Sequence, residues 1–248
     1  MISVHNPLKL HKSYDHSSSD RPRLAVVCIH GIATDSSSFE KALAYFKGME
    51  SLNDVRFIAF DLLGAGKSPA SVDLAYDYKE QLEALNNSIA DLKLDIPLVL
   101  IGHSMGTLIA TRYAYTHENA VKKLILISPP VYTERDLNDP AFLEAMRVFR
   151  DAVSLKSREK ASSNQFDASM KNIVSDKKNY QILAELTTPA TLIYGFKDQI
   201  IAPYNIPKVL RENPKFLTAI KTEGLHGVTV DKYSKIPKIL REVLDEIS

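Results

Sequence analysis

Short apolar runs alternate with stretches of helical period along most of this chain, and this alternation restricts the fold more than any other feature. Several runs are rich in β-branched residues and apolar on both faces, as buried parallel strands require. Helices between such strands cover the two faces of the sheet. We therefore predict an α/β fold with a mostly parallel sheet. Its expected strands are LAVVCIH (24–30), VRFIAFD (55–61), PLVLIGH (97–103), KKLILIS (122–128), ATLIYG (190–195) and FLTAIKT (216–222).

Apolar side chains recur at steps of three and four between these runs, which lines one face of a helix. The clearest stretch runs from Tyr78 to Leu92, and residues 236–244 repeat the pattern near the C-terminus. The first 20 or so residues offer only one candidate edge strand. At 248 residues the chain is long enough for one large domain with a sizeable core.

The alternation stops after residue 130. Residues 131–187 contain no convincing strand, only helical spacing such as Phe142, Met146 and Phe149. We interpret this stretch as a small, charge-balanced, mostly helical cap, inserted between two strands over an edge of the sheet. Residues 1–130 and 188–248 then form the core. The alternative is a pair of ordinary connecting helices.

The segment IGHSMGT, residues 101–107, carries the strongest chemical signal. It follows a predicted strand and leads into a helical stretch, so Gly102 to Gly106 fit the pattern G-x-S-x-G in the strand, turn and helix context that this pattern requires. The turn is crowded, which explains the two glycines. It exposes the hydroxyl of Ser104 above the sheet, in front of a helix N-terminus that favours developing negative charge. Ser104 is therefore the candidate nucleophile.

A serine hydroxyl is a weak nucleophile and needs a base, which in turn is held by a carboxylate. His226 follows the last predicted strand in a glycine-flanked loop and is the best candidate base. His103 is adjacent to Ser104, but side chains of neighbouring residues diverge in a sharp turn.

For the acid we favour Asp198, which follows the strand 190–195 by three residues. The order Ser104, Asp198, His226 is the one associated with this scaffold. The rival acids are Asp61, which precedes the serine, and Glu134 and Asp136, which belong to the insertion.

Acyl transfer also needs hydrogen-bond donors for an oxyanion. The backbone N–H of Met105, directly after the serine, is one candidate. The second is the N–H of Ile32, in the loop HGIATDSSSF after the first predicted strand. The alternative for this loop is an ordinary strand-to-helix turn capped by the serines at 36–38.

The segment DLLGAGKS, residues 61–68, ends like a phosphate-binding loop, but such a loop needs a glycine where this chain has Asp61. Asp61 and Ser68 are instead expected to satisfy backbone donors of the turn, and Lys67 to face solvent. Together, HG at 30–31, DLLGAGKS, GHSMG at 102–106, Asp198 and His226 resemble the α/β-hydrolase fold serine hydrolases. The resemblance covers residue 24 to the C-terminus. It implies a Ser104, His226 and Asp198 triad, with Ile32 and Met105 as the oxyanion hole, and a cap at 131–187.

The resemblance implies hydrolysis of carboxylic esters with small to medium acyl chains. Thioester and carbon–carbon bond hydrolysis are alternatives, although the chain has no Trp of the kind that usually surrounds the ring substrates of the latter. Dehalogenases and epoxide hydrolases of this fold have Asp as the nucleophile. The remaining alternative is a non-catalytic binding or signalling protein, because a fold does not prove turnover.

Composition limits the partners and the location. The chain has 31 basic and 30 acidic residues, which gives no electrostatic signal for nucleic acid or an anionic membrane. No apolar run approaches the ~20 residues of a membrane span, and no secretory signal is apparent. We therefore expect a small-molecule ester as the partner, no metal or organic cofactor, and a cytoplasmic location. The sequence does not indicate an oligomeric state.

Overall fold

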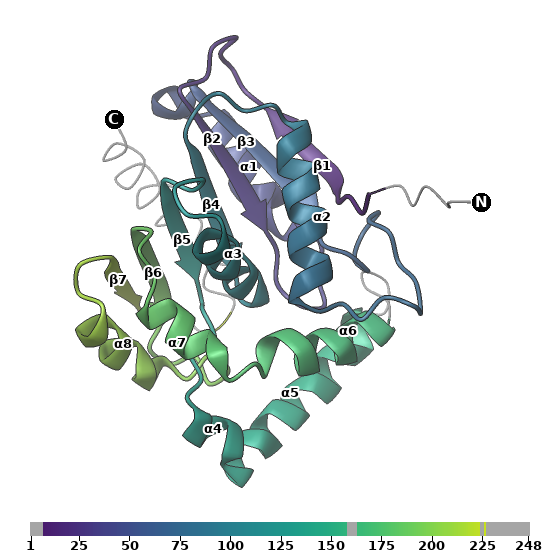
Figure 1. Cartoon of the computed structure of the whole chain (residues 1–248), viewed down its shortest axis with the longest axis vertical. Helices are drawn as coiled ribbons and strands as arrows, with labels where there is room; N and C mark the ends of the chain where they lie inside the picture. The colour runs from purple at the N-terminus through teal and green to yellow at the C-terminus, as the bar shows by residue number, and fades with distance from the viewer. Residues whose placement is uncertain (1–6, 158–162, 224–225, 227–248) are drawn as a thin grey trace.

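One mixed sheet forms the centre of the molecule (Figure 1). The computed structural model describes residues 7–157, 163–223 and 226. Within these residues, the strand order is β1-β3-β2-β4-β5-β6-β7. β1 pairs antiparallel with β3 at one edge, and all the other pairs are parallel. The strands are β1 (His11–His16), β2 (Leu24–Ile29), β3 (Val55–Asp61), β4 (Leu98–His103), β5 (Lys123–Ile127), β6 (Ala190–Gly195) and β7 (Leu217–Thr222).

The sheet confirms the predicted α/β fold. Each of the six predicted strands is present, with ends that differ from the prediction by one residue at most. β2, β4 and β6 are buried along nearly their whole length, which explains why their sequences are apolar on both faces. β1 is the predicted edge strand and is only partly buried.

Helices cover both faces of the sheet, and alternate residues of β2 point to opposite layers. Leu24, Val26 and Cys28 pack toward α1 (Glu40–Lys47), whereas Ala25 and Val27 pack toward α2 (Tyr78–Asp91) and α3 (Met105–Thr116). Burial raises the pKa of the Cys28 thiol to about 12, so this cysteine is a core residue and not a nucleophile. Short 3-10 turns at Ser36–Phe39, Glu50–Leu52 and Pro203–Asn205, and the helix α8 (Ile206–Glu212), complete the described core.

Only helices connect β5 to β6 in the described part of the chain. They are α4 (Glu134–Asn138), α5 (Pro140–Ser157), α6 (Ser163–Ser169), a π-helical turn (Met170–Val174) and α7 (Lys178–Ala184). Figure 1 shows α4, α5 and α6 beyond the end of the sheet toward which β2 points. The division into a core of 1–130 and 188–248 and an insertion of 131–187 stays a prediction. The predicted helical stretch 236–244 lies outside the described residues.

None of the helices in the described residues has both the length and the apolar character that crossing a membrane requires.

Candidate active site

Ser104 occupies a strained turn between β4 and α3. Its backbone has φ 51° and ψ −121°, which is a left-handed conformation that few residues other than glycine adopt. A Cβ atom on Gly102 would lie 2.6 Å from the backbone of Gly106 and Thr107, and one on Gly106 would lie 2.1 Å from the carbonyl oxygen of Ile29. The two glycines therefore let β4, α3 and β2 approach closely, which holds the turn in its strained shape.

This crowding predicts a large loss of stability for Gly106→Ala. The new methyl group collides with backbone rather than with a side chain that can move, so we expect the free energy of unfolding to fall by about 3 kcal/mol. Denaturant unfolding followed by circular dichroism measures it. Gly48→Ala is the matched control, because its nearest neighbour is an oxygen at 3.6 Å and its φ is −87°. Equal stability of the two variants would contradict the crowding.

Three predicted residues meet at this turn, although they are far apart in the sequence. The Oγ atom of Ser104 lies 3.0 Å from Nε2 of His226, and Nδ1 of His226 lies 2.9 Å from Oδ2 of Asp198. Ser104 is 8% exposed, and the Asp198 side chain is fully buried. The structure thus joins the hydroxyl, the imidazole and the carboxylate in one hydrogen-bonded chain.

Further hydrogen bonds fix the acid and the base. The second carboxylate oxygen of Asp198, Oδ1, accepts the backbone N–H of Ile200 at 2.9 Å. The carbonyl oxygen of His226 accepts the hydroxyl of Ser128 at 3.3 Å. Ser128 directly follows β5 and is itself buried, with its N–H bonded to the carbonyl of Ile193. The Ser128 hydroxyl therefore holds the backbone of His226 next to the end of β5, and the N–H of Ile200 holds the Asp198 carboxylate within its own loop.

The rival bases and acids have other positions. The His103 ring lies 5.6 Å from the His226 ring, and burial lowers its pKa to about 3, so it stays neutral near pH 7. Asp61 accepts hydrogen bonds from Ser36 and from the N–H of Lys67. Asp136 caps α4. Neither carboxylate bonds to a histidine in the described residues.

The loop DLLGAGKS has the predicted conformational role. Asp61 bonds two backbone N–H groups, and the Ser68 hydroxyl donates to the carbonyl of Asp61 and accepts the N–H of His11 at 2.7 Å. Lys67 is exposed, as expected. The segment therefore ties β1, β3 and the turn after β2 together.

The two predicted oxyanion donors belong to the N-terminus of α3 and to the loop after β2. Met105 is the first residue of α3, where the N–H groups have no partner within the helix. The loop after β2 approaches closely, since a Cβ atom on Gly31 would lie 3.1 Å from Cβ of Ser104. Ile32 is the next residue of that loop. The roles of Ile32 and Met105 stay predictions.

Two residues near the site were not predicted for it. The only sequence signal for Ser128 is its position directly after a strand. Phe149 was recognised as part of a helical stripe, and its ring lies 6.1 Å from the His226 ring at an interplanar angle of 74°. This contact brings α5 over the hydrogen-bonded chain.

Comparisons with known proteins agree with this fold. A family model described as the alpha/beta hydrolase fold matches residues 25–179. The chain is 28% identical to the AB hydrolase superfamily protein YisY of Bacillus subtilis, over 88% of this chain and 90% of the relative. The esterase EaEST of Exiguobacterium antarcticum superposes with a TM-score of 0.74 at 25% identity, covering 96% of both chains.

A further match is shorter. The probable lysophospholipase BODYGUARD 1 of Arabidopsis thaliana is 36% identical over 108 residues, which is 44% of this chain and only 23% of that protein. With the family model matching more than half of its length, and with the predicted sheet and strained serine turn in place, this chain belongs to the α/β-hydrolase fold family.

Proposed function

We propose that this protein is a serine hydrolase that cleaves carboxylic esters of small to medium acyl chains. The observation that carries the proposal is the hydrogen-bonded chain from Ser104 through His226 to Asp198, with distances of 3.0 and 2.9 Å. A hydroxyl in contact with an imidazole that is itself held by a buried carboxylate is the arrangement that activates a serine. Relatives whose names include esterase and lysophospholipase support ester bonds as the target.

The reaction follows from these groups. His226 takes the proton of Ser104 as its Oγ attacks the acyl carbon, and the N–H groups of Met105 and Ile32 stabilise the oxyanion. His226 then donates the proton to the departing alcohol, and the acyl group stays bonded to Ser104. Water gives a proton to the same imidazole as it attacks the acyl carbon, the bond to Oγ of Ser104 breaks to release the acid, and His226 returns the proton to Oγ. Asp198 keeps the imidazole oriented and stabilises its charged form.

An assay on a series of p-nitrophenyl esters of increasing chain length tests this proposal. We expect turnover that falls for the longest chains. Thioesters and carbon–carbon bond substrates, assayed in parallel, distinguish the alternative hydrolases. No turnover of any ester would contradict the proposal and favour the binding or signalling alternative. The cytoplasmic location and the small-molecule ester partner stay predictions from the sequence.

Phe149 provides a prediction for acyl selectivity. Its ring contacts His226 from α5, so it is placed to border the acyl group bound at Ser104. We expect Phe149→Ala to raise KM for hexanoyl esters about ten-fold, because apolar contact with the chain is lost, and to change KM for acetyl esters much less. Steady-state kinetics with both esters measures the difference.

Val148→Ala is the matched control for this change. Val148 is the neighbouring residue on α5 and is 55% exposed, so its truncation leaves the site untouched. Equal effects of Phe149→Ala on the acetyl and hexanoyl esters would show that Phe149 does not border the acyl chain.

A further inference from the structure

The loop that carries Asp198, residues 196–205, is bound to the first residues of the insertion, 131–136. The N–H of Val131 donates to the carbonyl of Ile201 at 3.2 Å, and the Asn205 side chain donates to the carbonyl of Val131 at 2.8 Å. The Tyr132 hydroxyl donates to the carbonyl of Ile200 at 2.5 Å. These contacts join residues that are 68 to 74 positions apart in the sequence.

Tyr132 connects this network to the acid most directly. Ile200, whose carbonyl accepts the Tyr132 hydroxyl, donates its own N–H to Oδ1 of Asp198 at 2.9 Å. Tyr132 is 3% exposed and packs edge-on against Phe142 of α5, with ring centroids 4.9 Å apart. Burial first, and then the negative charge of Asp198, raise the pKa of Tyr132 far above its usual value. The hydroxyl therefore remains protonated, and a hydrogen-bond donor, well above neutral pH.

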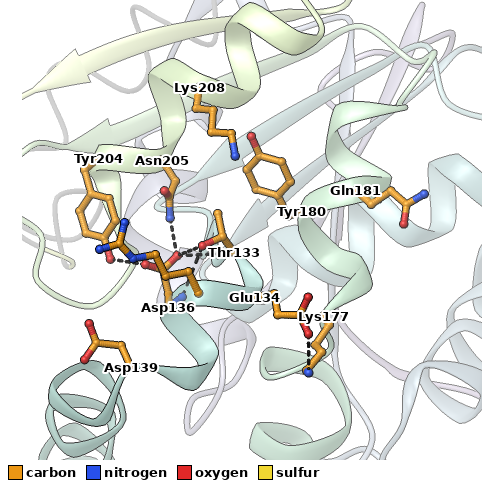
Figure 2. Close-up of a pocket in the computed structure, with 11 residues that line it drawn as sticks. Thr133, Glu134, Asp136, Asp139, Lys177, Tyr180, Gln181, Tyr204, Asn205 and Lys208 are labelled. Carbon is orange, nitrogen blue, oxygen red and sulfur yellow. Dashed lines mark hydrogen bonds and ion pairs between the residues drawn. The ribbon is translucent and has the colours of Figure 1, made fainter.

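Asp136 anchors the other end of the network (Figure 2). Its Oδ2 accepts the N–H and hydroxyl of Thr133 at 2.8 and 2.7 Å and the Asn205 amide at 2.7 Å, and its Oδ1 accepts the Tyr204 hydroxyl at 2.8 Å. Burial raises the pKa of Asp136, but the hydrogen bonds from Thr133, Tyr204 and Asn205 outweigh it, so the pKa lies below its usual range. Asp136 therefore stays ionised and keeps Asn205 and Tyr204 in place at neutral pH.

We propose that Tyr132 and Asp136 are positioning residues for the catalytic acid: they fix the loop 196–205 so that Asp198 meets His226. This inference rests on the proposed function. The proposed role is more than structural, because the N–H of Ile200 is hydrogen-bonded to the Asp198 carboxylate. A displacement of the loop at Ile200 would therefore also displace the carboxylate that orients the imidazole. The first residues of the insertion would then help to set the geometry of the triad.

Tyr132→Phe tests the inference by removing one oxygen atom while keeping the packed ring. We expect kcat/KM to fall about ten-fold, mostly through kcat, because one hydrogen bond to the acid loop is lost and the carboxylate shifts. The pH profile of kcat is recorded as well, because it responds to the contact between Asp198 and His226, whereas a loss of stability alone leaves it unchanged. Tyr78→Phe is the matched control: its partly buried hydroxyl donates to Asn179 at 2.6 Å, and Asn179 lies outside the loop 196–205.

Asp136→Asn provides a second test, because the amide places N–H groups against donors. We expect Asp136→Asn to lower kcat, as Tyr132→Phe does. The control is Asp139→Asn, which changes an exposed carboxylate that accepts the N–H of Ala141 at the start of α5 and should leave kcat unchanged.

The decisive comparison is a double-mutant cycle. If Tyr132 acts through Asp198, then Tyr132→Phe costs about ten-fold in the wild-type background and almost nothing in the Asp198→Asn background. An equal loss in both backgrounds, or a Tyr132→Phe enzyme with wild-type kcat and pH profile and only a lower Tm, would overturn the inference. An inactive wild-type enzyme would instead refute the proposed function, so the two failures are distinguishable.

Discussion

Ser104→Ala should lower kcat for ester hydrolysis by about 10⁶-fold. The loss is expected to be this large because Ser104 supplies the only bond to the acyl group, and His226 without it has no proton to accept. The turn should survive, since alanine meets the same steric limits as serine at φ 51°. Steady-state assays with a short p-nitrophenyl ester measure kcat, and circular dichroism verifies the fold.

The control for this variant is Ser175→Ala, which changes an exposed serine at the end of the π-helical turn. It should keep wild-type kcat. If Ser104→Ala retained wild-type activity, the serine mechanism would be wrong, whatever the geometry of the turn.

Asp198→Asn should lower kcat by about 10⁴-fold while the protein stays folded. The amide can donate a hydrogen bond to Nδ1 of His226 and so favour the tautomer whose Nε2 carries the proton and cannot accept one from Ser104. The amide also lacks the charge that stabilises the imidazolium. The measurement is kcat across a pH range, with thermal unfolding as the check on structure.

Asp61→Asn is the comparison that separates an acid in the triad from a structural carboxylate. Asp61 is as buried as Asp198, but its partners are Ser36 and the N–H of Lys67. The amide of an asparagine there would point N–H groups at groups that are themselves hydrogen-bond donors. We therefore expect the free energy of unfolding to fall by about 1–3 kcal/mol and kcat to stay within a few-fold of wild type. Comparable losses of kcat at both positions, with both variants folded, would mean that the acid is misassigned.

The sheet could be predicted from the sequence because its central strands are buried on both faces. β2, β4 and β6 are continuous apolar runs, a pattern that few other structures produce. β1 was only a candidate strand, because HKSYDH lies at an edge with a partly exposed, polar sequence. Its position follows from pairing with β3, which a single sequence does not encode locally.

The hydrogen-bonded chain of Ser104, His226 and Asp198 could also be anticipated, because each residue follows the carboxyl end of a strand and these ends lie on the same side of the sheet. The residues around this chain could not. The hydroxyl of Tyr132 bonds a backbone carbonyl 68 residues away, and Phe149 reaches His226 only through the packing of α5. Contacts of this kind depend on tertiary placement and leave no periodic signal in the sequence.

The most direct test of the account is covalent labelling of the wild-type protein with a fluorophosphonate, which reacts with activated serines. Mass spectrometry of the digested protein should find one adduct, on the peptide that contains Ser104, and one equivalent of label should abolish hydrolysis. The Asp198→Asn variant should react far more slowly, because its serine is less activated. An adduct on a different residue, or full ester hydrolysis by a protein labelled at Ser104, would contradict the account.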